Sequence, residues 1–309
     1  MESDFLKHVE LIAEFDSYED FSQSEYNDQD KYPSISVSKL KLFKKSPLHF
    51  KEHEYKETGA FEFGKAYHCY LLEPKEFKKR YYIYDETSII EILKGEGSKK
   101  PRSTTKYKEW VYLQHSNAEG KTLLDCFDFD NIKQMAGKVL KHHYTRSLIR
   151  NGIAEKFMFV KIIDQFGNEF YIKLIADYYK AQKRLITDLK TCQDASNDGF
   201  KKDAAKYDYH IQAALYADIF EKLNIEGFRW DFFFLAQEKT KPYAFNVFSA
   251  SSQFISQGRY EYEMLLMLWN ECRKTGNYEG YQVWCENKYG VNEISLPPWA
   301  INEINYFNH

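Results

Sequence analysis

Residues 174–191 read LIADYYKAQKRLITDLKT and predict two strands joined by a polar turn around residues 180–183. Asp177 lies near the end of the first strand, and Asp188 and Lys190 lie on the second. Because side chains alternate along a strand, two residues that are two positions apart project from the same face. A hairpin would therefore bring Asp177 beside Asp188 and Lys190.

These three side chains could serve phosphodiester hydrolysis. Two facing carboxylates repel each other unless a cation lies between them, and oxygen ligands with open positions suit Mg²⁺ or Mn²⁺. Such a metal polarises a phosphoryl oxygen, and a neighbouring lysine can orient or deprotonate the attacking water. The alternative is two surface carboxylates with a lysine that forms a salt bridge. The apolar neighbours of Asp188 disfavour it, because a charged pair inside a buried strand needs a partner.

The segments on either side alternate between helix and strand. The residue pattern predicts helices at 37–44, 63–72, 125–150, 207–223 and 252–275, and strands at 155–163, 169–179, 184–191, 228–236 and 244–249. This order is typical of an α/β fold with a mixed central sheet flanked by helices. No repeat or clear linker divides residues 34–309, so we expect them to form one domain with a helical N-terminal part.

Two further segments carry residues that could act with the hairpin. His68 lies in residues 61–77 (FEFGKAYHCYLLEPKEF), where a lone histidine can equally be a hydrogen-bonded core residue. Gln212 and Tyr216 lie in YDYHIQAALY and share one face of their helix, because they are four positions apart. The alternative for this helix is a surface of mixed polarity.

The ordered set of motifs resembles the RecE-like exonucleases, the exodeoxyribonuclease VIII group of the PD-(D/E)xK superfamily, which is related to the RecB nuclease domain. The resemblance covers residues 34–280 and is carried by SISVSKLKLFKKSPLHF, FGKAYHCYLLEPKEF, IKLIADYY, LITDLKTCQDAS and KYDYHIQAALYADI. Ala176 stands where the superfamily usually has a proline before the first acidic residue. The resemblance implies a restriction-endonuclease-like core and a metal-dependent exonuclease.

The resemblance also implies a set of metal ligands. His68, Asp177 and Asp188 would bind one or two Mg²⁺ or Mn²⁺ ions, and the Leu189 carbonyl would complete the shell. Glu155 matches an upstream acidic position of related nucleases and would bind a second metal. Glu155 could equally pair with a surface lysine.

The remaining motif residues are expected to handle water and DNA. Lys190 would position the attacking water, and Gln212 and Tyr216 would contact the DNA backbone or support the site. Four residues near the start of the matching region are candidates to hold a terminal phosphate: Ser36, Ser38, Lys45 and Ser46.

Charge is distributed unevenly along the chain, whose net charge is −3. Residues 1–30 hold ten acidic residues and one lysine, so the rest of the chain carries +6. We therefore expect residues 1–33 to form an acidic arm on a mildly basic body. Residues 94–108 hold six basic residues and one acidic residue and predict a mobile basic loop. Basic surface is typical of proteins with polyanionic partners, although it can be ordinary solvated surface. The candidate DNA contacts in this loop are Lys99, Lys100 and Arg102.

Other classes of protein have no support in the sequence. No stretch approaches the roughly 18 apolar residues of a membrane-spanning helix, and the acidic N-terminus is unlike a signal peptide, so we expect a cytoplasmic protein. The five cysteines form no CxxC motif, which argues against disulfide, zinc and iron–sulfur sites. Residues 59–66 (GAFEFGKA) lack the final Ser or Thr of a phosphate-binding loop, so no ATP site is expected.

We therefore expect a metal-dependent exonuclease that degrades linear double-stranded DNA from 5′ to 3′ for recombination or repair. Direction, strandedness, a ring-shaped homo-oligomer (a tetramer in the RecE case) and a single-strand-annealing recombinase as partner are implied by the resemblance alone. One alternative is a DNA-binding module that keeps the fold without cleavage. Another is a single-strand exonuclease or an endonuclease of the same superfamily.

Overall fold

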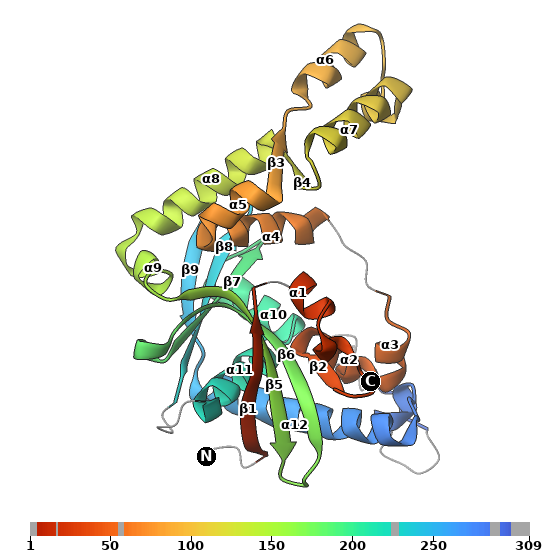
Figure 1. Cartoon of the computed structure of the whole chain (residues 1–309), viewed down its shortest axis with the longest axis vertical. Helices are drawn as coiled ribbons and strands as arrows, with labels where there is room; N and C mark the ends of the chain where they lie inside the picture. The colour runs from red at the N-terminus through yellow and green to blue at the C-terminus, as the bar shows by residue number, and fades with distance from the viewer. Residues whose placement is uncertain (1–4, 17, 55–58, 224–228, 285–290, 298–309) are drawn as a thin grey trace, which may run out of the picture. The chain divides into compact units, whose positions relative to one another are not determined.

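The computed structural model describes residues 5–16, 18–54, 59–223, 229–284 and 291–297 (Figure 1). The chain divides into two compact units. The first consists of residues 1–37 and 55–264, and the second of residues 38–54 and 265–309. The predicted division at residue 33 into an arm and one domain is therefore not the division that the structure has.

The first unit contains a seven-stranded mixed sheet in the order β1-β5-β6-β7-β8-β9, with β2 also paired to β6. Neighbouring strands are antiparallel except for the parallel pairs β7–β8 and β2–β6. This arrangement confirms the predicted mixed sheet, and Figure 1 shows its strong twist. The strands are β1 (Leu6–Phe15), β2 (Ser34–Ser36), β5 (Ile153–Asp164), β6 (Glu169–Lys180), β7 (Leu185–Cys192), β8 (Asp231–Glu238) and β9 (Phe245–Ser249).

Helices α4 (Gly59–Leu72) and α8 (Cys126–Lys141) pack on one face of this sheet. Tyr67 of α4 and Met135 of α8 join Leu189 of β7 and Leu235 of β8 in one buried cluster. The Tyr67 hydroxyl donates a hydrogen bond to the side chain of Gln237, whose amide nitrogen donates to the Met135 carbonyl over 3.0 Å. Buried polar groups that are paired in this way hold two elements in one relative position.

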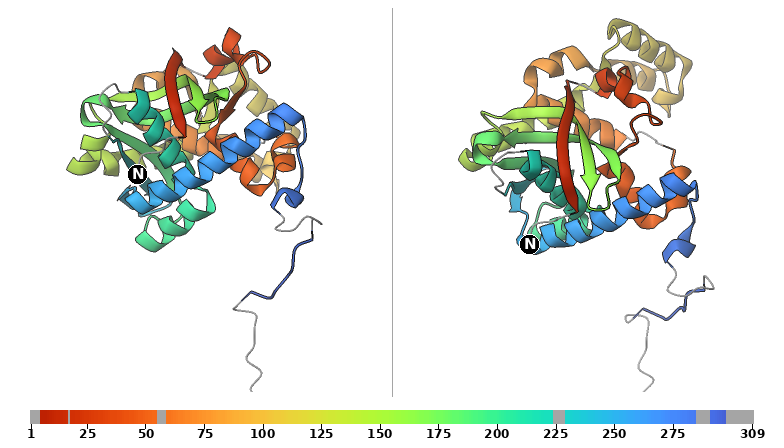
Figure 2. Two further views of the ribbon diagram at one scale, coloured as in Figure 1. Left: turned by 90° about the horizontal axis from the view of Figure 1, so that it is seen from below. Right: turned by 60° about the horizontal axis from the view of Figure 1, so that its bottom comes forward.

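Helix α11 (Tyr209–Leu223) lies against the opposite face, and the part of α12 (Ser252–Thr275) that belongs to this unit, up to Met264, contacts it. Leu189 of β7 faces α4 and α8. The residue before it, Asp188, faces the opposite side of the sheet and accepts a hydrogen bond from Gln212 of α11. This follows from the alternation of side chains along a strand. Within the first unit, Arg259 of α12 forms an ion pair with Asp218 of α11 (2.5 Å). Figure 2 shows α11 and the start of α12 from two further directions.

The predicted acidic arm is wrong for residues 6–15, which form the edge strand β1 and pair antiparallel with β5. Phe5 and Leu6 are buried, and Phe21 of the short helix α1 (Tyr18–Ser22) stacks on Phe157 at 4.8 Å. Along β1 the carboxylates of Glu10 and Glu14 are exposed, whereas Leu6 is buried and Val9, Ile12 and Phe15 are partly buried, so the strand can cover apolar surface while its charges remain in water. The net charge of the segment concealed these apolar positions.

The predicted basic loop at residues 94–108 also differs from the structure. It contains the end of α6 (Thr87–Gly95), the 3₁₀ turn η2 (Pro101–Ser103) and the start of α7 (Thr105–Asn117). Two of its basic side chains are paired, because Arg102 bonds to Glu86 and Lys106 lies 2.6 Å from Glu96. Glu86, the partner of Arg102, lies outside the basic run, so a count of charges within the run missed this ion pair.

Several other elements were not predicted. The two-stranded parallel sheet of β3 (Tyr81–Tyr84) and β4 (Thr122–Asp125) flanks α6 and α7 in sequence. The helix predicted at 125–150 is divided at His142 into α8 and α9 (His143–Leu148). The remaining short helices of this unit are α5 (Pro74–Arg80), α10 (Asn197–Lys206) and the 3₁₀ turns η1 (Glu25–Asn27) and η3 (Ala181–Lys183).

The second unit is helical. It contains α2 (Val37–Lys45, of which Val37 belongs to the first unit), α3 (Pro47–Lys51), the second half of α12 and η4 (Tyr281–Trp284). Phe50 packs between Phe43 and Tyr278, at 4.4 and 6.3 Å between ring centroids. The indole N–H of Trp284 donates to the Lys45 carbonyl over 3.1 Å. Among the described residues, no helix combines the length and the apolar character needed to cross a bilayer.

Candidate active site

Asp177 and Asp188 lie where β6 and β7 separate. These strands pair only through residues 178–180 and 185–187. The next pair in this register would be Asp177 and Asp188, but the ladder ends before it and β7 continues beside β8. One edge of β6 is paired with β5. The opposite edge is shared by two strands, because β7 pairs with residues 178–180 and β2 pairs with residues 171–173. Asp177 therefore lies at an opening in the sheet between β2 and β7.

Glu155 lies opposite Asp177 on the neighbouring strand β5. In the β5–β6 ladder, Ala154 lies opposite Tyr178 and Lys156 lies opposite Ala176. This register would place Glu155 opposite Asp177, but that pair is missing from the ladder. Glu155 has a backbone φ of 48°, which residues with a Cβ rarely adopt. Strained backbone of this kind concentrates at functional sites. The two carboxylates therefore face each other at an irregularity of the sheet.

His68 reaches the two carboxylates from α4. Its neighbour Tyr67 is fully buried, and Gly64 lies so close to the sheet that an added Cβ would be 3.7 Å from Thr191 Oγ1. This packing fixes the helix against β7. His68 Nδ1 lies 3.4 Å from Glu155 Oε1 and 3.5 Å from Asp177 Oδ2. The alternative of a hydrogen-bonded core histidine is thus set aside for His68, because its ring is directed at two carboxylates.

His68, Glu155 and Asp177 fit a divalent cation. One ligand atom from each lies within 4.8 Å of the others. Glu155 Oε1 is buried and has no well-formed hydrogen bond beside its 3.4 Å contact with His68 Nδ1, and such a buried carboxylate oxygen is stabilised when a cation binds it. Two carboxylates and one imidazole suit Mg²⁺ or Mn²⁺, with imidazole favouring the transition metal. We name these three residues the metal triad.

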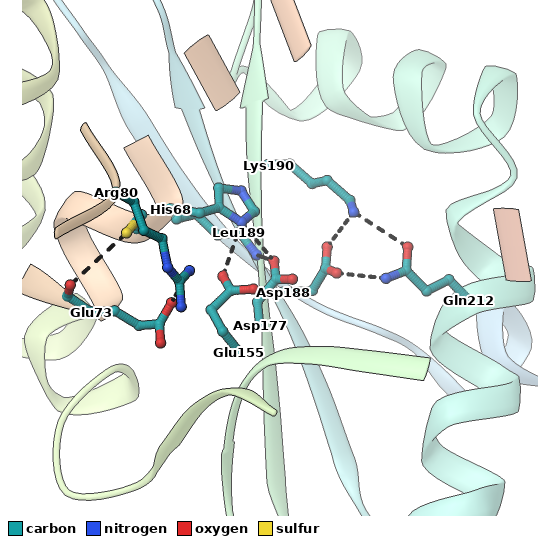
Figure 3. A network of polar contacts seen from close by, with 10 residues as sticks. His68, Glu73, Arg80, Glu155, Asp177, Asp188, Leu189, Lys190 and Gln212 are labelled. Atoms are coloured by element: carbon teal, nitrogen blue, oxygen red, sulfur yellow. Dashed lines mark hydrogen bonds and ion pairs between the residues drawn. The ribbon is translucent and has the colours of Figure 1, made fainter. Parts of the chain in front are cut away.

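Asp188 lies beside the metal triad in a second polar group, the lysine network of Asp188, Lys190 and Gln212 (Figure 3). Lys190 Nζ lies 2.7 Å from Asp188 Oδ2 and donates to Gln212 Oε1 over 3.3 Å. The Gln212 side-chain N–H donates to Asp188 Oδ1 over 2.7 Å. Each of the three residues thus contacts the other two, which fixes the position of the lysine ammonium.

Burial and neighbouring charges shift the pKa values of the metal triad. Burial raises the pKa of Asp177, and Glu155 raises it further, while His68 and Lys190 oppose the rise. Burial alone would lower the pKa of His68, but Asp177 and Glu155 outweigh burial and raise that pKa to about 9. In the metal-free protein His68 is therefore a cation at neutral pH and partly neutralises the two carboxylates.

Burial and neighbouring charges also shift the pKa values of Asp188 and Lys190 in the lysine network. Burial raises the pKa of Asp188 to about 6, although Lys190 opposes the rise. Burial would lower the pKa of Lys190, but Asp188 and Asp177 outweigh it and raise the pKa above its ordinary value. Without metal, Lys190 is therefore an ammonium, which can orient a water or stabilise negative charge but cannot accept a proton.

The other predicted members of the site are supporting groups in this geometry. Tyr216 is 7% exposed, and its side chain interacts with the backbone of Ile175, two residues before Asp177. Leu189 is buried between α4 and β8, and its backbone N–H donates to Asp177 Oδ2 over 2.7 Å. Tyr216 is thus placed to support the site, and the metal-ligand roles predicted for Asp188 and for the Leu189 carbonyl stay predictions.

The sequence reasoning missed Tyr209 and Arg80. Lys190 Nζ lies 4.8 Å from the centroid of the Tyr209 ring, which can stabilise the ammonium by a cation–π interaction. Tyr209 lies three positions before Gln212, so the helical period could have identified it. Arg80 of α5 donates to Glu73 over 3.1 Å in the network of Figure 3. Nothing in the local sequence pattern points to Arg80.

Comparisons with known proteins agree with this arrangement. A family model for a PDDEXK-like domain of unknown function (DUF3799) matches residues 36–287. The chain belongs to this PDDEXK-like family. It is also similar to a crystal structure from Eubacterium rectale named "Putative exonuclease", with 17% sequence identity and a TM-score of 0.53 over 89% of this chain and 94% of that chain. At this identity the likeness concerns the fold. No curated protein matches the chain.

The PDDEXK-like core was thus predicted correctly from the motifs, whereas the narrower RecE-like group stays a prediction. The Asp177…Asp188-x-Lys190 hairpin supplies the residues after which PDDEXK-like proteins are named, with Asp in the second acidic position. The structure adds Glu155 and His68 to that hairpin from β5 and α4.

The candidate phosphate-binding residues lie on different elements of this PDDEXK-like protein. Ser36 ends β2, opposite Lys173 of β6, and the exposed Ser38 and Lys45 lie on α2. Ser46 is fully buried and caps α3, where its hydroxyl oxygen accepts a hydrogen bond from the His49 backbone N–H over 3.3 Å. The hydroxyl of Ser46 thus caps α3 in this structure, and its role in phosphate binding stays a prediction.

The candidate DNA contacts at residues 99–102 lie between α6 and α7. Lys99 and Lys100 are exposed, while Arg102 is paired with Glu86. Lys99 and Lys100 are thus the members of this group that can meet a phosphate without first breaking that ion pair.

Proposed function

We propose that this protein is a Mg²⁺- or Mn²⁺-dependent exonuclease that hydrolyses phosphodiester bonds of linear double-stranded DNA, from 5′ to 3′, in recombination or repair. The observation that carries this proposal is the adjacency of the metal triad and the lysine network at the opening between β2 and β7. The PDDEXK-like family supports nuclease chemistry. The motif resemblance to RecE-like exonucleases supports the direction and the duplex substrate.

The roles of the residues follow from their positions. His68, Glu155 and Asp177 would hold the cation, which supplies positive charge at the phosphoryl oxygens and lowers the pKa of water. Lys190, held by Asp188 and Gln212, would orient the attacking water and stabilise the negative charge that develops on the phosphate. The buried Asp188 keeps the ammonium from turning away, so this orientation exists before DNA binds.

Binding the cation requires a proton to leave His68. A histidine ligand must be neutral, and the pKa of His68 is about 9 in the metal-free protein. The imidazolium therefore occupies the place of the cation and reduces the repulsion between Glu155 and Asp177 until metal arrives. With both carboxylates ionised, the triad carries a net charge of −1 with the imidazolium and zero with a divalent cation and a neutral imidazole.

The first experiment uses linear duplex DNA labelled at one 5′ end, beside a covalently closed circle, with and without Mg²⁺. We expect Mg²⁺-dependent release of labelled nucleotide from the linear DNA and no cutting of the circle. Cutting of the circle would establish an endonuclease instead. Binding of both DNAs without cleavage of either would establish a DNA-binding module that lacks catalysis, and degradation of single strands alone would establish a single-strand exonuclease.

Assembly is a separate part of the proposal. The resemblance favours a ring, in which DNA threads a channel and stays bound between successive cleavages. It also favours delivery of the resulting 3′ single strand to an annealing recombinase. The mass of the full chain in solution, measured by light scattering, tests the ring, and a monomer at micromolar concentration would remove it.

A further inference from the structure

An aromatic stack leads from the core of the first unit to its surface beside the lysine network. Phe234 of β8 is 2% exposed and stacks with Tyr209 at 5.7 Å between ring centroids. Tyr209 in turn stacks with Tyr207 at 5.8 Å, with an interplanar angle of 25°. Phe200, which is also buried, packs against Tyr209 at 5.9 Å. The inner end of the stack is thus fixed in the core.

The outer end of the stack is open to solvent, since Tyr207 is 47% exposed. Its ring lies immediately before α11, and α11 carries Gln212 of the lysine network. Tyr209 connects Tyr207 with the lysine network, because its ring stacks on Tyr207 and its centroid is 4.8 Å from Lys190 Nζ. An exposed aromatic ring is therefore two contacts away from the lysine that we assign to catalysis.

An ammonium group lies over this ring, and the neighbouring sequence also holds Asp203 and Asp208. Lys206 Nζ lies 5.0 Å from the Tyr207 ring centroid, and Lys206 and Lys202 are exposed one helical turn apart on α10. A nucleotide offers both a flat base and a phosphate, so an aromatic ring next to an exposed ammonium group complements both parts. Aromatic rings that take bases by stacking, together with lysines that follow the backbone, are the general device for holding single-stranded DNA.

We propose that Tyr207 forms a stacking subsite for an unpaired nucleobase of the DNA strand that enters the active site. This inference rests on the proposed nuclease function and adds a substrate-binding residue to it. Successive nucleotides of one strand advance about 3.4 Å along the duplex axis, so the two contacts between Tyr207 and Lys190 place the base within a few nucleotides of the bond that is cut. Stacking involves the faces of the base, and the subsite therefore accepts all four bases.

The rigidity of the stack supports this role. Tyr209, which itself packs against Phe200, contacts Tyr207 from the core side, so part of the freedom of the Tyr207 side chain is already lost before a base binds. Stacking on Tyr207 would also keep the strand end separated from its complement next to Lys190. An exonuclease that works on duplex ends needs such a separation of the terminal nucleotides.

The test measures equilibrium binding of the full chain to duplex DNA with a short unpaired end, with Ca²⁺ in place of Mg²⁺ and with DNA integrity checked on gels. The same DNA with abasic residues in the unpaired end is the second ligand. Tyr207→Ala should bind the intact end about tenfold more weakly than the wild type does. On the abasic end, the variant and the wild type should have the same affinity. Tyr207→Phe should match the wild type on both ligands, because it keeps the ring.

Tyr260→Ala is the matched control, because Tyr260 is also exposed (60%) but lies on α12. It should leave both affinities unchanged. Equal losses on intact and abasic ends for Tyr207→Ala, or no loss on either, would overturn the subsite. A second test needs only the wild type, which should bind the intact end about tenfold more tightly than the abasic end. Equal affinities of the wild type for the two ends would also overturn the inference.

Cleavage assays separate this inference from the proposed function. Wild-type protein that binds intact ends more tightly than abasic ends but cuts no DNA in Mg²⁺ would keep the subsite and remove the nuclease. Mg²⁺-dependent cleavage with no preference between intact and abasic ends would keep the nuclease and remove the subsite.

Discussion

The backbone N–H of Leu189 donates a hydrogen bond to Asp177 Oδ2 over 2.7 Å. This bond crosses from β7 to β6 just beyond the point at which their ladder ends, and it pairs a backbone donor that would otherwise lose its partner in the sheet. The same carboxylate oxygen lies 3.5 Å from His68. One side chain therefore both closes the opening in the sheet and faces the metal triad.

Replacing Asp177 by Asn should remove metal binding and cleavage together. The amide keeps the size of the side chain but removes the charge that the cation requires. We expect isothermal titration with Mn²⁺ to show at least a hundredfold weaker binding and nuclease assays to show no turnover above background. Circular dichroism should remain that of the wild type. Wild-type affinity for Mn²⁺ would show that the triad is assigned incorrectly.

Replacing Lys190 by Ala should separate metal binding from turnover. The metal triad stays intact, so Mn²⁺ affinity should change little, while turnover should fall by about 10² to 10³ because the ammonium no longer stabilises charge on the phosphate. Lys190→Arg should not restore activity, since a planar guanidinium does not fit the geometry set by Asp188 and Gln212. Single-turnover kinetics at saturating metal measure the effect. Full activity of either variant would contradict the role of Lys190.

Gln212 is predicted to act by positioning Lys190 and Asp188. Gln212→Ala removes both of its hydrogen bonds and should lower turnover by about 10- to 100-fold while the KM for DNA stays nearly constant. Gln257→Ala is the control, because Gln257 is an exposed glutamine that bonds to Glu261 on α12. It should behave as the wild type. A rise in KM without a fall in kcat would instead place Gln212 in contact with DNA.

The pH dependence of metal binding should follow His68. Its pKa is about 9 in the metal-free protein, above the ordinary 6.5, so the affinity for Mn²⁺ should rise as the pH increases from about 6.5 to 9. Calorimetry in buffers of different ionisation enthalpy should detect close to one proton released per metal near pH 7.5. His68→Asn should lose this release. Metal binding without proton release by the wild type would show that His68 is neutral beforehand.

The same shift predicts how the metal-free fold responds to pH. Because folding raises the pKa of His68, its contribution to stability is complete below about pH 6.5 and is lost as the pH rises through about 9. Denaturant titrations in EDTA should therefore show a midpoint that falls over this range in the wild type. The fall should be smaller in His68→Asn.

The edge strand β1 should contribute to stability as part of the sheet. Leu6→Ala and Leu11→Ala make the same change on one strand, but Leu6 is fully buried and Leu11 is 40% exposed. We expect the free energy of unfolding to fall by about 2–5 kcal/mol for Leu6→Ala and by about 0.5 kcal/mol for Leu11→Ala. Urea titrations measure both values. Equal small effects would restore the picture of residues 1–33 as a separate arm.

The local pattern of the sequence determined the elements of the central fold. The helix predicted at 252–275 has the observed bounds, and the strands predicted at 155–163, 169–179 and 184–191 lie within one or two residues of β5, β6 and β7. These segments have strong periodicity, which is a local property. The motifs also identified the residues that meet at the opening of the sheet, since Asp177, Asp188 and Lys190 are fixed by their spacing on one hairpin.

Tertiary structure alone decided which distant residues complete the site and which segments join the sheet. Nothing near Glu155 in the sequence shows that it faces Asp177 with a φ of 48°, because that position depends on the register of β5 against β6. The place of β1 beside β5, across about 150 residues of chain, depends on burial of apolar side chains that charge counting hides. Spacing within one element is set by backbone geometry, whereas contacts between elements depend on how their buried faces pack, and a single sequence does not record that packing.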